Sequence, residues 1–175
     1  MHHRRFALPT LALVVLAGCG SADDDEFAPA DVEFARQMIP HHAQAVEMAG
    51  MLPSDGVSPE LTELAAAIAG AQQPEIDQMT AMLDRWGYVP PPPEGGHAHE
   101  MAGMLTEDDL AALDAATGAE FERMWLTMMI EHHEGAIEMA ETVLDDGVDP
   151  EARELAEEIV DVQQAEIARM ERMLG

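Results

Sequence analysis

The sequence predicts an all-α protein, a four-helix up-down bundle made of two repeated helical hairpins with a long crossover connection. Two matching segments, 38–49 and 129–140, lie 91 residues apart. This offset holds without a gap over positions 34–84 of the first copy, with 24 identities in 51 aligned positions. Apolar residues recur every three or four positions, and strand-like alternation is absent. Each copy is therefore expected to form one pair of antiparallel helices.

The first 18 residues have the pattern of a lipoprotein signal peptide. A short basic region is followed by the apolar run 6–17, which is shorter than the ~20 residues that a membrane-spanning helix needs. The run ends in Leu-Ala-Gly-Cys, the pattern of a bacterial lipobox, and Cys19 is the only cysteine. We expect lipidation at Cys19, a tether over 19–30, and a location outside the cytoplasm on a bacterial cell membrane. The alternative is an ordinary secretory signal with an incidental cysteine.

The charge of the chain argues against nucleic acid as a partner. The sequence contains no lysine, and its formal net charge of -27 becomes -29 when Arg4 and Arg5 leave with the signal peptide. Such a surface repels phosphate backbones and attracts cations. The same charge also keeps a domain soluble, so acidity alone does not predict a metal site.

The metal-binding domain is expected to cover residues 31–175, with repeat 1 at about 31–86, the connection at 87–117 and repeat 2 at about 118–175. In repeat 1, a helix should run from an N-cap at Asp31 to about Leu52. After a turn that ends at Gly56, the sequence Ser58-Pro59 predicts the start of a second helix, which should reach about Trp86.

The second repeat has the same punctuation as the first. One helix is expected over about 119–144, and another should follow an Asp149 cap from Pro150 to about Leu174. In the connection, the prolines at 90–93 predict extended chain, and Thr106 predicts the cap of a short helix that ends near 116. A connection of this length allows a crossover along the bundle, as in ferritin-like folds.

The histidine pairs are the candidate metal site. At 100° per residue, both histidines of each pair share one arc with the apolar stripe, whereas Glu47 and Glu138 lie on the opposite side. Imidazole and thioether ligands suit copper, and the thioethers favour Cu(I) over Cu(II). We therefore predict these copper ligands: Met38, His41, His42, Met48, Met129, His132, His133 and Met139.

An alternative without metal also explains buried histidines. A neutral imidazole must satisfy both ring nitrogens, and Gln72, Gln163 or backbone carbonyls are expected to do so in that case. If the histidines are ligands, protons are expected to compete with the metal as the pH falls through ~6.5. The Gly-rich part of the connection adds a second candidate, an accessory entry site, for which the alternative is a plain linker. Its residues are His97, His99, Met101 and Met104.

The repeated motifs resemble a known family. Met-Ile-x-His-His, then Ala-(Val/Ile)-Glu-Met-Ala, then Gln-Gln-x-Glu-Ile-x-x-Met, occur twice, and the stretch from Gly103 through Phe121 is similar too. This combination resembles the CopM-like family of secreted bacterial four-helix domains over about 31–175. The resemblance implies a ferritin-like helical bundle that binds copper through Met and His, with a role in copper tolerance outside the cytoplasm.

Three functions are compatible with the sequence. The first is a lipid-anchored protein that buffers copper or hands it on, and that is not an enzyme. The second is a metal-free envelope interaction module with an unknown protein partner. The third is a ferritin-like di-metal oxidase, which needs inward glutamates; Glu75 and Glu166, at the edge of the arc, are the only candidates. No nucleophile–base constellation supports another class of enzyme.

Overall fold

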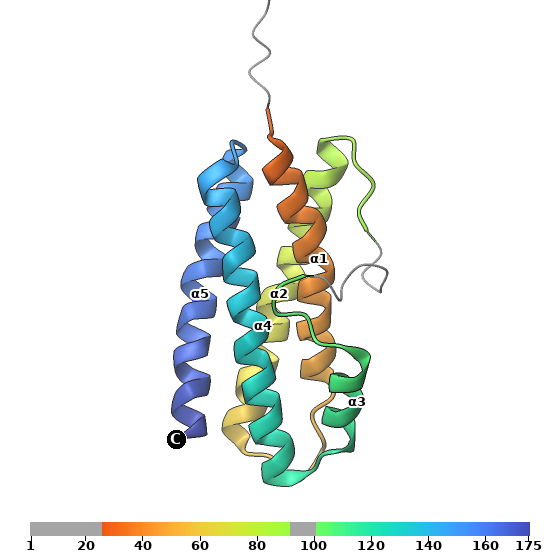
Figure 1. The fold of residues 1–175 in the computed structure, drawn as a ribbon, viewed down its shortest axis with the longest axis vertical. Helices are drawn as coiled ribbons and strands as arrows, with labels where there is room; N and C mark the ends of the chain where they lie inside the picture. Colours follow the sequence, from red (N-terminus) through yellow and green to blue (C-terminus); the bar gives the residue numbers. More distant parts are fainter. Residues whose placement is uncertain (1–25, 92–100) are drawn as a thin grey trace, which may run out of the picture.

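The described part of the chain is entirely helical. The computed structural model describes residues 26–91 and 101–175, and these form five α-helices and no strand, which confirms the predicted all-α class. Four long helices lie side by side, and one short helix packs near one end of the bundle (Figure 1). Cys19, His97 and His99 lie outside the described residues. The helices are α1 (Pro29–Gly50), α2 (Pro59–Arg85), α3 (Glu107–Ala115), α4 (Gly118–Asp146) and α5 (Pro150–Leu174).

Side chains at the helix starts explain most of these boundaries. Ser58, Thr106 and Asp149 each accept hydrogen bonds from free backbone N–H groups of the first turn, as expected of N-caps. The predicted cap at Asp31 is wrong, because α1 already begins at Pro29. Proline is favoured in the first turn, since it has no N–H to leave unpaired. Within residues 26–91 and 101–175, no helix is both long and apolar enough to cross a membrane.

The core consists of two hydrophobic clusters. The first contains Met38 of α1 and Ala136 of α4, and the second contains Ala45 of α1 and Met129 of α4. On each of these helices, the histidine pair lies between a residue of one cluster and a residue of the other. The bundle therefore has a polar layer, which we call the histidine layer, between two apolar halves.

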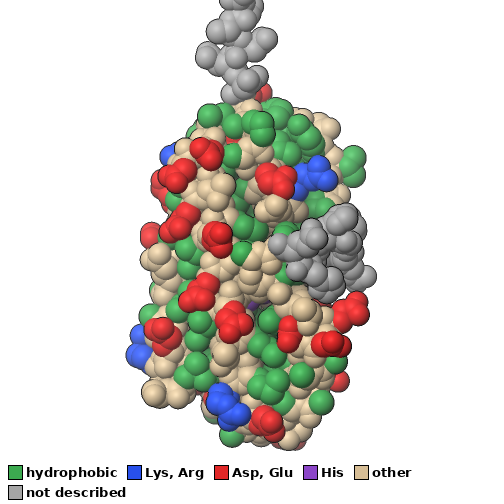
Figure 2. Space-filling model, viewed as in Figure 1, with side chains coloured by type: hydrophobic (Ala, Val, Ile, Leu, Met, Phe, Trp, Pro, Cys, Tyr) green, Lys and Arg blue, Asp and Glu red, His purple; other side chains and the backbone are tan. Residues whose placement is uncertain are grey.

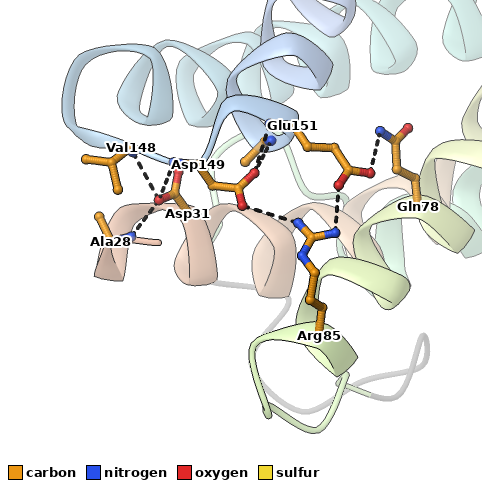
Figure 3. Close-up of polar contacts among 8 residues, drawn as sticks. Ala28, Asp31, Gln78, Arg85, Val148, Asp149 and Glu151 are labelled. Carbon is orange, nitrogen blue, oxygen red and sulfur yellow. Dashed lines mark hydrogen bonds and ion pairs between the residues drawn. The ribbon is translucent and has the colours of Figure 1, made fainter. Parts of the chain in front are cut away.

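Each hairpin is tied to the helix start of the other. The Oδ2 atom of Asp31 accepts hydrogen bonds from the backbone N–H groups of Ala28, Val148 and Asp149, so it joins α1 to the start of α5 (Figure 3). At the equivalent position of the second copy, Glu122 accepts bonds from the N–H and the hydroxyl of Ser58. These ties hold the hairpins in one register and so position the histidine layer.

Arg85 forms two ion pairs at the end of the bundle where α5 begins. Arg85 of α2 contacts Asp149 at 3.2 Å and Glu151 at 2.7 Å, and its side chain is 41% exposed (Figure 3). The visible face carries many carboxylates and few arginines (Figure 2). Among the described residues, the buried carboxylates are those of Asp31 and Asp149.

Candidate metal centre

The four histidines lie together at the middle of the bundle and are inaccessible to solvent. His41 and His42 lie on α1, and His132 and His133 on α4; all four are 0% exposed. The rings of His41 and His132 have centroids 3.8 Å apart, and those of His132 and His133 are 6.3 Å apart. The structure thus brings the two predicted pairs into one cluster across the α1–α4 interface.

Carboxylates, and not the expected glutamines, hold one histidine of each pair. The Nε2 atom of His42 lies 2.7 Å from Oε2 of Glu75 on α2, and Nε2 of His133 lies 2.8 Å from Oε2 of Glu166 on α5. His41 uses its Nε2 to contact the carbonyl oxygen of Ala102 at 3.1 Å. The predicted glutamine partners are wrong, since neither forms a hydrogen bond with a histidine, whereas the predicted backbone-carbonyl partner occurs at His41.

Several buried nitrogens of the histidine layer have no partner. Both ring nitrogens of His132 are unpaired, and so is Nδ1 of each of the other three histidines. The side-chain oxygens of Gln72 and Gln163, which are buried copies of one position, are also unpaired. A buried polar group without a partner costs ~1–3 kcal/mol, so such a cluster is expected where the groups serve a ligand.

Burial lowers the pKa of three of these histidines, His41, His42 and His132, and so favours their neutral form. Removal from water, together with the charge of neighbouring His42, lowers the pKa of His41 to about 3. Burial also lowers the pKa of His42, against the opposing effect of Glu75, and lowers the pKa of His132 well below its usual range. Neutral imidazole is the form that binds metals. The predicted proton competition near pH ~6.5 is therefore wrong for His41, which stays unprotonated to much lower pH.

The predicted methionine ligands divide between the two apolar halves. Met38 and Met139 belong to one cluster, and Met48 and Met129 to the other. Three of them are 0% exposed, but Met139 is 8% exposed and lines a surface groove of about 380 Å³ between α1 and α4. Met38 and Met129 are three and four positions from their histidines, so they share a helix face with them.

The connection crosses over the histidine layer. The side chain of Gln44 donates a hydrogen bond to the carbonyl of Leu105 and accepts one from its N–H, at 3.0 and 2.8 Å. On α4, Gly135 leaves room for the crossing chain: a Cβ there would lie 2.2 Å from the carbonyl oxygen of Ala102. We call residues 101–105 the strap. It carries two of the four predicted accessory residues, Met101 and Met104, both half-buried.

Several of these residues are not evident from the sequence pattern. Glu75 and Glu166 were predicted only as candidates for a di-metal oxidase, although both copies place this glutamate 33 positions after the histidine. Gln44 and Gly135 were not predicted, because their roles depend on where the strap crosses. The available signal was weak: these two residues occupy the same repeat position but differ.

The donors fit a borderline or soft metal ion. Unprotonated imidazole nitrogens and nearby thioethers are ligands for copper in particular. Within residues 26–91 and 101–175, no three His, Cys, Asp or Glu side chains form a group that would hold a metal ion by themselves. The described part of the chain is thus an all-helical protein with buried histidines and glutamines, and half-buried glutamates, between methionine-containing clusters.

The chain belongs to the DUF305 family, a domain of unknown function, whose model matches residues 31–174. This confirms the resemblance to the CopM-like family. Comparison with the curated proteins finds no match.

Solved structures of the family are similar to this chain over most of their length. A DUF305 fragment from Deinococcus radiodurans is 37% identical, with a TM-score of 0.76, over 85% of this chain and 97% of that one. A protein of the family from Streptomyces coelicolor, classed as secreted, is 31% identical, with a TM-score of 0.74, over 83% and 91%. CopM in its Cu(II)-bound form is 32% identical, with a TM-score of 0.70, over 82% and 95%. CopM also has Cu(I)-bound and silver-bound structures.

Proposed function

We propose that this protein binds copper outside the cytoplasm, as a lipid-anchored member of its family that buffers the ion or hands it on. The observation that carries the proposal is the buried histidine layer, in which five ring nitrogens have no partner. The similarity to CopM, with its copper-bound and silver-bound structures, supports the choice of metal. In this proposal copper is cargo, and the protein is not an enzyme.

The proposed ligands are the imidazole nitrogens together with methionine sulfur, on an up-down four-helix bundle of ferritin-like type. Met38 and Met129 are the first thioether candidates, because each shares a helix face with its histidine pair. Met48 and Met139 lie farther along the same helices, in opposite apolar halves, so they would not share one ion. Thioethers favour Cu(I), so Cu(I) is expected to bind more tightly than Cu(II).

A competition titration with a chromogenic Cu(I) chelator tests the histidines. Replacement of His41, His42, His132 and His133 by Gln should abolish tight binding while the helical content measured by circular dichroism is preserved. The thioethers are tested with one double variant, and a second double variant is the matched control. Met38→Leu with Met129→Leu should weaken Cu(I) binding, whereas Met79→Leu with Met170→Leu, also buried copies of one position, should not. A folded histidine variant that competes as well as wild type would contradict the proposal.

Membrane attachment is a separate part of the proposal and has its own test. Its support is the lipobox that ends at Cys19 and the secreted class of the Streptomyces coelicolor relative. Cys19→Ala should move the protein from the membrane fraction to the soluble extracytoplasmic fraction. Unchanged fractionation, or a mature N-terminus without acyl groups in mass spectrometry, would contradict the proposed lipid anchor. The proposal of copper binding would be unaffected.

The di-metal oxidase is the second candidate, because each histidine pair has a carboxylate neighbour. Glu75 and Glu166 contact His42 and His133, and such carboxylates occur in di-metal centres of helical bundles. Oxygen consumption by the protein with added Fe(II), measured against the same Fe(II) solution without protein, distinguishes the candidates. We expect equal rates; a clear excess with protein would favour the oxidase.

A further inference from the structure

Two carboxylate–histidine pairs, each with a buried histidine, occur at equivalent places in the two hairpins. The distance from Glu75 to His42 is 2.7 Å, and that from Glu166 to His133 is 2.8 Å. Each glutamate lies on the second helix of its hairpin and reaches across to the first. The histidines are 0% exposed, and the glutamates only 14% and 15%.

The chemistry of these contacts determines which ring nitrogen carries the proton. An ionised carboxylate has no proton and only accepts hydrogen bonds, so the nitrogen that contacts it must be the donor. In both pairs this nitrogen is Nε2. A neutral imidazole has one N–H, so in the neutral form Nδ1 of His42 and of His133 carries a lone pair. Neither Nδ1 atom has a hydrogen-bond partner.

We propose that Glu75 and Glu166 are positioning residues that hold His42 and His133 in the Nε2–H tautomer and so present Nδ1 to the metal. A carboxylate on the second ring nitrogen fixes the orientation of a ligating imidazole and increases its basicity. The metal half of this inference rests on the proposed function, whereas the tautomer is a property of the metal-free protein.

The other histidine of each pair lacks this support. His41 donates to the neutral carbonyl oxygen of Ala102, and His132 has no partner at either nitrogen. A neutral carbonyl orients the ring but does not add a negative charge. Each His-His pair thus combines one carboxylate-oriented histidine with one that is free of carboxylate contact, and the effect of removing the glutamates should be confined to His42 and His133.

The test is a double variant, Glu75→Gln with Glu166→Gln. A glutamine amide offers both an acceptor and a donor, so it keeps the size of the side chain but no longer imposes one tautomer. The matched control is Glu47→Gln with Glu138→Gln, which alters the exposed glutamates that also form an equivalent pair on α1 and α4. Both variants remove the same amount of charge.

The first readout is long-range ¹H–¹⁵N NMR of the histidine rings in metal-free protein. Wild type and control should show Nε2–H and unprotonated Nδ1 at His42 and His133, and the Glu75→Gln/Glu166→Gln variant should show a mixed or reversed tautomer at these two residues only. The wild-type measurement needs no variant to fold. An Nδ1–H tautomer of both residues in wild type would overturn the inference even if copper binds.

The second readout is Cu(I) affinity by chelator competition. The Glu75→Gln/Glu166→Gln variant should bind ~10–100-fold more weakly than wild type, the usual effect of removing such a partner, and the control should bind as wild type does. Equal affinity of this variant and wild type would overturn the positioning role and leave the proposed function standing. Failure of wild type to bind Cu(I) would instead overturn the proposed function, and with it the metal half of the inference.

Discussion

The two hairpins share one polar centre but meet the strap in opposite ways. In both, a glutamate 33 positions after the second histidine contacts its Nε2 atom. The position two residues after this histidine differs: it is Gln44 in the first copy, where it holds Leu105, and Gly135 in the second, where it admits Ala102 and Gly103. A single strap contacts both copies, so equivalent positions of the two copies face different residues of the strap. The two copies therefore differ where the strap crosses, and both keep the contact between glutamate and histidine.

This divergence makes the first histidines of the two pairs unequal. His41 is bonded to the strap through Ala102, whereas its copy His132 has no partner at either nitrogen. Both are fully buried. His132 therefore carries the larger desolvation cost, and the strap stabilises only one side of the centre.

Acid should produce the largest effect, because it acts on both copies of the centre. Burial lowers the pKa of His41, His42 and His132 in the folded protein, so below pH ~6.5 the unfolded chain binds protons that the folded one does not. The contribution of these histidines to the free energy of unfolding is fully present above this pH and is lost as the pH drops. For His41 the loss continues down to a pH of about 3. Each histidine contributes up to ~1.4 kcal/mol per pH unit.

Urea unfolding at pH ~7 and ~5 measures this loss, which should reach several kcal/mol. The control is His41→Gln, which removes one titrating group and should flatten the profile. A free energy of unfolding that is equal at both pH values in wild type would show that the histidines are not buried as neutral groups.

Gly135→Ala tests how closely the strap approaches the second copy. The added Cβ would lie 2.2 Å from the carbonyl oxygen of Ala102, a backbone atom that moves only if the strap moves. We expect a loss of ~1–3 kcal/mol in urea unfolding, as for other overpacked sites. The control is Gly70→Ala on α2, where nothing lies within 4 Å of the added Cβ; it should be neutral or stabilising, because alanine is the better helix former. Equal effects of the two substitutions would contradict the close approach.

The ties between the hairpins should differ in strength. Asp31 is 0% exposed and accepts bonds from three backbone N–H groups, whereas Glu122 is half-buried and accepts from one N–H and one hydroxyl, both of Ser58. We expect Asp31→Asn to cost ~2 kcal/mol and Glu122→Gln ~1 kcal/mol, because each substitution weakens charge-assisted hydrogen bonds. Thermal and urea unfolding of the two variants measure the difference. A larger loss of stability for Glu122→Gln than for Asp31→Asn would mean that the desolvation cost of buried Asp31 exceeds the stabilisation by its hydrogen bonds.

Gln44→Met, compared with Gln72→Met, tests the hydrogen bonds that hold the strap. The first substitution leaves the N–H and carbonyl of Leu105 without their partner and should cost ~1–2 kcal/mol. The second removes a buried amide that has no partner, so it should be neutral or stabilising in metal-free protein. Both glutamines are buried on long helices, and unfolding free energies of the two variants are directly comparable. Destabilisation by Gln72→Met to the same extent would show that its amide is satisfied.

The sequence alone predicted the helices, the caps at Ser58, Thr106 and Asp149, the duplication and the inward direction of all four histidines. These features follow from local rules: side-chain spacing on a helix decides which residues share a face, and a free N–H in the first turn selects the capping residue. The error at Asp31 is of the same local kind, because an acidic residue is favoured both as a cap and within the first turn.

The tertiary structure alone decided which atoms of the centre meet. The glutamate partners of His42 and His133, and the passage of the strap between Gln44 and Gly135, depend on residues more than 30 positions away. The lowered pKa of His41 depends first on its burial among these elements. Helical periodicity gives the direction of a side chain about the axis of its own helix. It does not give the rotation of the neighbouring helix or its position along the bundle axis. The loss of water around each ring, which sets its protonation, is known only when all the surrounding helices are in place.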